Sequence, residues 1–451
     1  MPKLENFSGY RHETGPARPQ LDYSGAFQAE VFGSGSDVPI GRRSFLKGAG
    51  ASLAMFLVGT SSVRGAQGDA VRVGFIFPQQ GIVAGEAAAI LAGFECCLKE
   101  KGGLSVEILR KDSGPEDQKT LEALAELLMK SQVQFLVCTP SLDGSEKILH
   151  ASADAPALIF VTNPSVRLEA GELCVPSSFR VRANTYQSAQ PLAAWAIKNI
   201  GLRVFITGDD DTQGNEEADF FAYGFEKAGG AFVDRLMAAP GPGNMKLVLE
   251  AVTMSKPDLV FASFRKKSAE DFLKVYRSAS PALTHPVIGP ESLTAWPSFQ
   301  RGAGKAAVGV RTLTTMVNPA EFTARVKKVT GKEVGDAARA AEGYEIAQIV
   351  LKASREVLQG SIGQAGLVKF VEEMELEGPR GKIRFDKNHE PILDVMVQEW
   401  ALNGGAFSQK ILANLGTCVS PDFGCGRVGF PKRPEKELKE EEEQGWLEHE
   451  E

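Results

Sequence analysis

Polar and charged side chains follow the predicted strands of this chain, at the points where apolar runs end. Ser141 and Thr162 each follow such a run, and Glu291 follows the short run 287–288. In sheets of parallel strands, ligands lie beyond the carboxyl ends of the strands. This placement predicts a binding site that includes these side chains. The alternative is that the hydroxyls cap the turns that follow them, and that Glu291 caps a helix or lies in solvent.

A second group of charges follows two further apolar runs. Three consecutive aspartates, residues 209–211, follow one run, and Arg265 follows another. Three carboxylates can bind a hard cation, but aspartate also caps helix N-termini, which is the simpler interpretation. Arg265 can clamp a carboxylate through two parallel hydrogen bonds. With the two lysines after it, Arg265 can equally form a solvated basic patch.

Composition and motifs exclude several classes of protein. The formal net charge is −7, and no basic stripe interleaved with aromatic residues is present, which argues against nucleic-acid binding. The six cysteines show no C-x-x-C pairing and the five histidines are scattered, so a zinc or haem site is not expected. The sequence also lacks a G-x-S-x-G elbow and a Walker-type phosphate loop. We therefore predict no enzymatic activity, no cofactor and no metal.

Residues 71–103 show the unit from which the chain is built. The run Val71–Phe77 is almost continuously apolar and predicts a strand, which the following proline ends. A glycine-containing loop, residues 78–85, can approach a ligand closely, and helical spacing begins at Ala87. Strand, loop and helix form the first half of a β-α-β unit, so this loop is predicted to be a wall of the binding site.

The same unit recurs in two successive series, and 451 residues are too many for one ordinary core. The sequence therefore predicts an α/β fold of two doubly wound, Rossmann-like lobes joined by a hinge. The charged C-terminal run is predicted to be a solvated tail. The predicted division is lobe 1 over residues 71–186 and 318–380, lobe 2 over residues 187–317 and 381–415, and a tail over residues 416–451.

The N-terminal segment has the features of an export signal. Its first part is polar and shows no periodicity, as in disordered segments. Arg42 and Arg43 then precede Phe45, Leu46 and a moderate apolar run, a pattern that resembles a twin-arginine (Tat) signal. We predict a disordered leader and signal peptide over residues 1–68 and export to the periplasm. The alternative is an arginine pair before a buried helix.

Over residues 71–404, the order of short motifs resembles the leucine/isoleucine/valine-binding class of type I periplasmic solute-binding proteins. The matching motifs are, in chain order, Val73-Gly74, Lys101-Gly102-Gly103, Thr162-Asn163-Pro164, Asp209-Asp210, Gly289-Pro290-Glu291, Gly378-Pro379-Arg380-Gly381 and Phe385-Asp386. Each motif is common, but their order over this length is specific. The resemblance implies two lobes that close over a small-molecule ligand, which a membrane ABC permease then receives.

The resemblance also implies roles for the polar residues at the strand ends. In the family, hydroxyls and backbone N–H groups near the positions of Ser141 and Thr162 take the ligand's carboxylate. A carboxylate in the Gly-Pro-Glu context of Glu291 takes the ligand's ammonium. Gln213 and Arg265 stand where the family often has aromatic residues, which argues against a plain branched-chain amino acid. Gln213 can form hydrogen bonds and Arg265 can bind a second carboxylate, so both are predicted ligand contacts.

These observations predict an exported, non-enzymatic receptor for a small amino-acid-like or carboxylate solute, with an ABC permease as its partner. A sensor of the same fold for an amide or urea, which signals to a protein partner, is the alternative. Cys418 and Cys425 flank a segment with proline and glycine, and in the oxidising periplasm they are a reasonable disulfide. Whether Cys138 and Cys174 meet stays open at this point.

Overall fold

The computed structural model describes residues 70–80, 84–114, 117–138, 141–153, 155–169, 173–279, 283–296, 299–358, 364–423 and 425. The predicted export signal, with Arg42, Arg43, Phe45 and Leu46, lies outside the described residues, as does the tail from residue 426 onward. In the described part, no helix is long and apolar enough to cross a membrane.

The first lobe is built on five parallel strands in the order β2-β1-β3-β4-β5. Helices cover both faces of a sheet of this kind, which is why β3 and β4 are buried along their whole length. The strand predicted at Val71–Phe77 is confirmed as β1. The remaining strands are β2 (Val106–Asp112), β3 (Phe135–Cys138), β4 (Leu158–Val161) and β5 (Ser178–Arg180).

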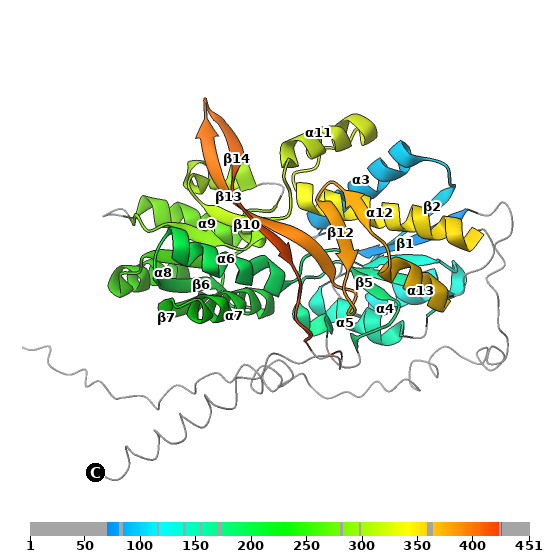
Figure 1. Cartoon of the computed structure of the whole chain (residues 1–451), viewed down its shortest axis with the longest axis horizontal. Helices are drawn as coiled ribbons and strands as arrows, with labels where there is room; N and C mark the ends of the chain where they lie inside the picture. Colours follow the sequence, from blue (N-terminus) through cyan, green and yellow to red (C-terminus); the bar gives the residue numbers. More distant parts are fainter. Residues whose placement is uncertain are drawn as a thin grey trace, which may run out of the picture.

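Helices from both ends of the described chain cover this sheet (Figure 1). They are α3 (Ala84–Lys101), α4 (Asp117–Ala125), α5 (Leu142–Ala151), α11 (Pro319–Thr330), α12 (Ala337–Leu358) and α13 (Gln364–Glu372). A π-helical turn, Glu126–Lys130, continues α4, and a 3₁₀ turn, Val166–Glu169, follows β4.

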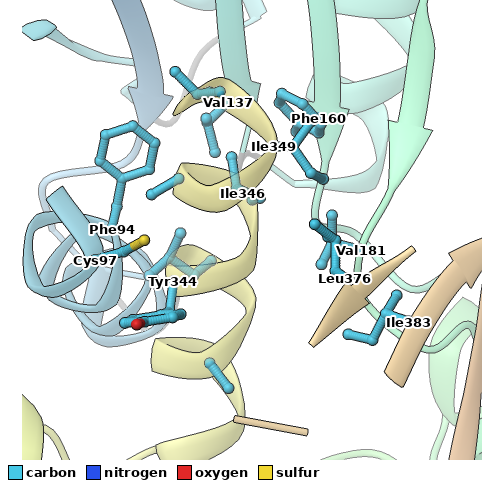
Figure 2. Packing of buried hydrophobic residues seen from close by; sticks show 14 of the residues in the cluster. Phe94, Cys97, Val137, Phe160, Val181, Tyr344, Ile346, Ile349, Leu376 and Ile383 are labelled. Carbon is cyan, nitrogen blue, oxygen red and sulfur yellow. The ribbon is translucent and has the colours of Figure 1, made fainter. Parts of the chain in front are cut away.

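The central packing of the first lobe joins α3 to α12, two helices far apart in the sequence (Figure 2). A Cβ on Gly93 would lie 1.7 Å from the carbonyl oxygen of Ala340, and one on Gly343 would lie 1.8 Å from that of Ile90. Only glycine permits this approach, so the two helices touch backbone to backbone. In Figure 2, Phe94 and Cys97 of α3 lie beside α12.

The second lobe contains the strands of the second series. The larger sheet has the order β11-β12-β13-β10-β9-β8-β6-β7, and β14 pairs with β13. The β6 to β10 segment is parallel, as the second β/α series predicts, whereas β13 runs antiparallel to β10, β12 and β14. The strands are β6 (Arg203–Asp209), β7 (Ala231–Ala238), β8 (Leu259–Ser263), β9 (Val287–Gly289), β10 (Arg311–Thr314), β11 (Leu376–Gly378), β12 (Gly381–Phe385), β13 (Pro391–Asn403) and β14 (Ala406–Cys418).

Helices pack on this sheet as well, and they make two further apolar clusters. The helices are α6 (Thr185–Asn199), α7 (Thr212–Lys227), α8 (Pro242–Ser255), α9 (Lys266–Ser278) and α10 (Phe299–Ala303), with 3₁₀ turns at Glu291–Leu293 and Gly304–Ala307. Two largely parallel sheets with helices at their sides confirm the predicted α/β class.

Strand β13 belongs to both lobes. Its first half packs Leu393 and Val395 into the core of the first lobe, whereas Val397 and Trp400 pack into the clusters of the second. Figure 1 shows this long strand running from one lobe to the other. The neighbouring strand β12 also contributes its inward side chains to the first core. The division of residues 381–415 into the second lobe stays a prediction, and the packing assigns the start of that segment to the first.

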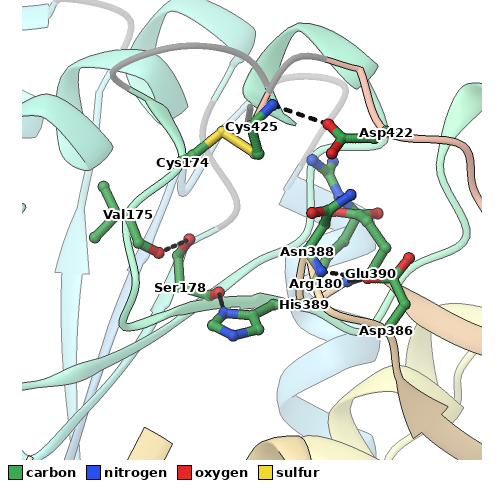
Figure 3. The surroundings of a disulfide bond; sticks show 10 residues. All are labelled: Cys174, Val175, Ser178, Arg180, Asp386, Asn388, His389, Glu390, Asp422 and Cys425. Atoms are coloured by element: carbon green, nitrogen blue, oxygen red, sulfur yellow. Dashed lines mark hydrogen bonds and ion pairs between the residues drawn. A yellow bond between two sulfur atoms is a disulfide. The ribbon is translucent and has the colours of Figure 1, made fainter. Parts of the chain in front are cut away.

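The predicted Cys418–Cys425 disulfide is wrong. Cys425 is bonded to Cys174 of the first lobe, 251 residues earlier, and Cys418 is free. Cys418 lies in β14, where its backbone pairs with Leu393 of β13. Cys425 lies in the segment after this strand and is bonded to the first lobe. Figure 3 shows that the bond ties the segment after β14 to the loop before β5.

Candidate ligand-binding cleft

A cavity of about 80 Å³ lies between the two lobes. Its walls come from the start of α3, the segment that enters α6, the first turns of α7, α9 and α12, and the loop after β9. The charged residues that line it are Arg182, Arg265, Lys266 and Arg339 among the bases and Glu86, Glu217, Glu291 and Asp336 among the acids. The cavity is therefore a polar site with both signs of charge, and none of its described lining residues is aromatic.

Two ion pairs of opposite polarity join the lobes across this cavity. Lys266 Nζ of the second lobe lies 2.9 Å from Glu86 Oε1 of the first. Arg339 Nη2 of the first lobe lies 2.7 Å from Glu291 Oε2 of the second. Because each lobe supplies one cation and one anion, a solute that carries both charges can match both sides when the lobes close.

An acidic corner surrounds Arg339 at the start of α12. Asp336 accepts a hydrogen bond from the backbone N–H of Arg339 through Oδ1 (3.1 Å), which caps the helix. Its other oxygen, Oδ2, receives no hydrogen bond from the described residues and lies 3.9 Å from Arg339 Nε. Burial raises the pKa of Asp336 to about 7, although Arg339 opposes this. A buried carboxylate oxygen without a donor is a site for an external cation or N–H group.

The pKa of Glu86 is shifted downward, in the opposite direction to that of Asp336. Burial alone would raise its pKa, but Arg182, Lys266 and Arg339 outweigh burial and hold the pKa at about 2. Arg182 Nη1 lies 3.1 Å from Glu86 Oε2. Glu86 is therefore charged at neutral pH, and it pairs with Lys266 and Arg182 on the cleft wall.

The second lobe supplies the predicted residues Gln213 and Arg265, and both line the cavity. Gln213 Nε2 donates to Glu217 Oε1 (3.0 Å), and burial raises the pKa of Glu217 to about 7. Arg265 pairs with Asp211 through Nη2, while its buried Nη1 has no hydrogen-bond acceptor among the described residues. One guanidinium nitrogen is thus available to an anionic group of a ligand.

Glu291 also lines the cavity, as its position after a short strand predicts. Its Oε1 accepts from the backbone N–H of Thr315 (3.2 Å), and Oε2 pairs with Arg339. No side-chain cap on the following 3₁₀ turn involves Glu291, since the N-cap residue is Pro290. The side chain is directed at the opposite lobe, and the ammonium contact itself stays a prediction.

Ser141 and Thr162 do not line the cavity. Ser141 caps α5, where its Oγ accepts from the N–H of Gly144 (3.2 Å), and Thr162 is buried and donates to the carbonyl oxygen of Cys138 (3.1 Å). These are the capping and turn contacts that the alternative interpretation describes. Their predicted role in ligand binding gains no support from the cavity. The loop 78–85 supplies no described lining residue either, whereas Glu86 directly after it does.

The aspartates 209–211 have structural roles, as the simpler interpretation predicts. Asp211 caps α7, with its Oδ1 accepting from the N–H of Gly214 (2.9 Å). Asp209 Oδ2 accepts from the N–H of Arg265 (2.9 Å). Within the described ranges, no group of three or more histidine, cysteine, aspartate or glutamate side chains is arranged to hold a metal ion.

Glu216 joins the lobes behind the cleft. Its carboxylate accepts from Ser165 Oγ and Thr185 Oγ1, each at 2.7 Å, and only 4% of the residue is exposed. Burial raises its pKa from 4.5 to about 7. Between these two pH values the folded protein holds a proton that the unfolded chain has released, so this group's contribution to stability falls as the pH rises from 4.5 to about 7.

We expect Glu216→Gln to remove this pH dependence. The neutral amide resembles the protonated acid, so at pH 8 the variant should unfold with a free energy about 3 kcal/mol higher than the wild type, and at pH 4.5 the two should agree. Urea unfolding at both pH values measures this difference. Glu250→Gln, on the exposed side of α8, is the matched control and should change neither value. An unchanged pH dependence in Glu216→Gln would show that this carboxyl titrates normally.

Two α/β lobes with a charged cavity between them are the arrangement of the type I periplasmic binding fold. The chain belongs to the periplasmic binding protein family, whose model matches residues 70–406. A curated relative, Leu/Ile/Val-binding protein homolog 6 of Brucella abortus (strain 2308), is 25% identical over 353 residues, which cover 74% of this chain and 87% of the relative.

Solved structures share the fold. One is an ABC-transporter solute-binding protein from Rhodopseudomonas palustris in complex with benzoate, with a TM-score of 0.67, 20% identity and coverage of 80% of this chain and 100% of that one. Another is a leucine-binding protein from Thermotoga maritima MSB8, with a TM-score of 0.63, 21% identity and coverage of 77% of this chain and 99% of that one. The predicted family and fold class are thereby confirmed.

Proposed function

We propose that this protein is an exported receptor that captures a small zwitterionic, amino-acid-like solute between its lobes and delivers it to a membrane ABC permease. The observation that carries this proposal is the cavity itself, with two bases and two acids facing it from each lobe. Small-molecule sites are usually mostly apolar with a few polar groups. A cleft with this many charges favours a solute that is itself charged. Buried charges need partners of opposite sign when the closed cleft excludes water, and such a solute supplies them.

The two signs of charge are arranged so that a zwitterion can contact both. The acidic corner with Glu291, Asp336 and Glu86 offers acceptors for an ammonium group. Arg265 and Lys266 of the second lobe offer donors for a carboxylate, beside the amide of Gln213. An acidic or polar amino acid fits this pattern better than a branched-chain one, because its side chain adds a polar group for the remaining charges.

The relatives indicate two kinds of solute. Benzoate is the ligand named for one similar structure, and leucine is named for another. An aromatic acid or a branched aliphatic side chain needs an apolar wall, which here is limited to Pro164, Ala183, Ala295, Leu313 and Val395. We therefore favour a more polar solute than either. Nothing in the comparisons supports the amide or urea sensor.

The same proposal includes the route of export. The family is periplasmic by its description, and the arginine pair Arg42-Arg43 before an apolar run supports the twin-arginine pathway. Delivery to an ABC permease is supported by similar structures that are described as ABC-transporter solute-binding proteins.

A thermal-shift screen tests the proposal. At 100 times its Kd, a solute that binds only the folded state should stabilise the protein by about 2.7 kcal/mol. We expect acidic and polar amino acids to raise the unfolding temperature and to reduce the radius of gyration in X-ray scattering. Benzoate and leucine at equal concentrations serve as matched probes and should have smaller effects. If only benzoate stabilises the protein, the zwitterionic assignment is wrong, and if only leucine does, the preference for a polar side chain is wrong.

A further inference from the structure

The segment after β14 crosses the junction between the lobes. We define the C-terminal strap as residues 419–423 together with Cys425. β14 lies in the larger sheet, and Cys425 at the other end of the strap is bonded to Cys174 in the first lobe, with Cα atoms 5.7 Å apart. Figure 3 shows Cys425 and Asp422 of the strap beside Cys174 and Arg180 of the first lobe. The strap is therefore an additional, covalently closed connection between the lobes.

Side chains of the strap pack on the segment that crosses from β5 into α6. Asn184 Nδ2 donates to Ser420 Oγ (2.7 Å), and Asn184 is fully buried. Phe423 contacts Tyr186 of α6 and Phe220 of α7, with ring centroids 6.1 and 5.4 Å apart. The strap is thus held on the second lobe by aromatic packing and on the first by the disulfide.

The crossing segment has the ligand cleft on its other side. Gln187 lines the cavity, and its Nε2 donates to the carbonyl oxygens of Pro391 (2.7 Å) and of Cys418 (3.2 Å), the residue directly before the strap. In the same crossing segment, Arg180 Nε pairs with Glu390 Oε1 at 2.9 Å, and Asn184 Nδ2 donates to Glu390 Oε2. Any rotation of the lobes has to move these residues past the strap.

We propose that the Cys174–Cys425 disulfide fastens the C-terminal strap against the crossing segment and thereby restrains the opening of the lobes, a restraint that a dithiol reductant releases. The two half-cystines are partly exposed, whereas Cys96, Cys97 and Cys138 are buried. Burial raises the pKa of the Cys138 thiol, and these thiols stay unreactive. Among the described cysteines, reduction therefore acts at the Cys174–Cys425 bond, and this release does not require a bound ligand.

The release is a thiol–disulfide exchange. A thiolate of the dithiol attacks one sulfur of the disulfide and forms a mixed disulfide, while the other cysteine leaves as a thiolate and takes up a proton. The second thiol of the reagent then breaks the mixed disulfide. The reagent becomes a cyclic disulfide and gives up two electrons, and Cys174 and Cys425 each end as thiols.

The test compares the ligand-free mature protein before and after treatment with dithiothreitol, with alkylation and mass spectrometry reporting the state of each cysteine. Reduction should increase the radius of gyration and speed amide hydrogen exchange in residues 180–188 by roughly tenfold, since the local opening becomes easier. Cys425→Ser should behave like the reduced protein without reductant. Cys418→Ser, the control, should respond to dithiothreitol as the wild type does.

Equal scattering and equal exchange in the oxidised and reduced wild type would overturn the proposal, and this comparison does not depend on whether Cys425→Ser folds. A peptide map that joins Cys425 to a cysteine other than Cys174 would overturn it as well. Faster exchange spread over the whole protein, with none concentrated in residues 180–188, would show a loss of global stability instead and would also count against it.

Discussion

Glu291→Gln is expected to weaken the binding of an amino-acid solute by about 3–5 kcal/mol, the effect of removing one partner of a buried ion pair. Glu291 lines the cavity and faces the first lobe. The substitution keeps the shape and the acceptor for the Thr315 N–H but removes the negative charge. Arg339 is not left alone in the free protein, because Glu342 and Asp336 still lie beside it. The loss should therefore fall on the bound ammonium.

Isothermal titration with the best amino acid from the screen measures this loss. A carboxylic acid of the same length without the amine is the ligand control, and its affinity should change little. Glu321→Gln, at an exposed position of α11, is the protein control and should bind normally. If Glu291→Gln binds the amino acid with full affinity, the ammonium lies elsewhere, and Asp336→Asn becomes the substitution to make.

Arg380→Met is expected to lower the free energy of unfolding by about 3–5 kcal/mol. The Arg380 side chain is 1% exposed and lies in the turn between β11 and β12. Its Nε donates to Glu345 Oε2 (2.9 Å) and its Nη2 donates to the carbonyl oxygen of Val181 (2.8 Å). Burial raises the pKa of Glu345 and Arg380 opposes this, so the variant leaves a buried carboxylate without its cation.

Urea unfolding at pH 7 measures the effect of Arg380→Met. Arg384→Met, the same change at an exposed position of β12, is the matched control and should stay within about 0.5 kcal/mol of the wild type. Arg380→Met combined with Glu345→Leu should recover much of the loss, because an apolar pair can replace a buried ion pair. Equal stability of Arg380→Met and the wild type would mean that the buried pair contributes nothing.

The sequence predicts most of the fold because buried parallel strands are continuous apolar runs. Val71–Phe77 is apolar apart from Arg72 and Gly74 and becomes β1, and the continuous run of residues 158–161 becomes β4. β14 was not predicted, because Ala406–Cys418 mixes polar and apolar residues at the side of the sheet and has no continuous apolar stretch. Its formation depends on pairing with β13, which is a tertiary contact.

The site was predicted in part. Arg265 and Glu291 stand at strand ends, where the topology of a parallel sheet directs them to the cleft. Asp336 and Arg339 belong to the start of α12 and have no such signal, because they follow no apolar strand. The Cys174–Cys425 pairing joins residues 251 positions apart, and no spacing rule foresees it.

The sharing of β13 between the lobes has a consequence for how the chain acquires its structure. The first core needs Leu393 and the second needs Trp400, and both residues come after the two β/α series in the sequence. Neither lobe can close its core during synthesis until this strand has left the ribosome. Both lobes therefore finish folding together and late, instead of one after the other. A twin-arginine signal, which we propose for this chain, suits such a precursor, because late and joint folding favours completion before export.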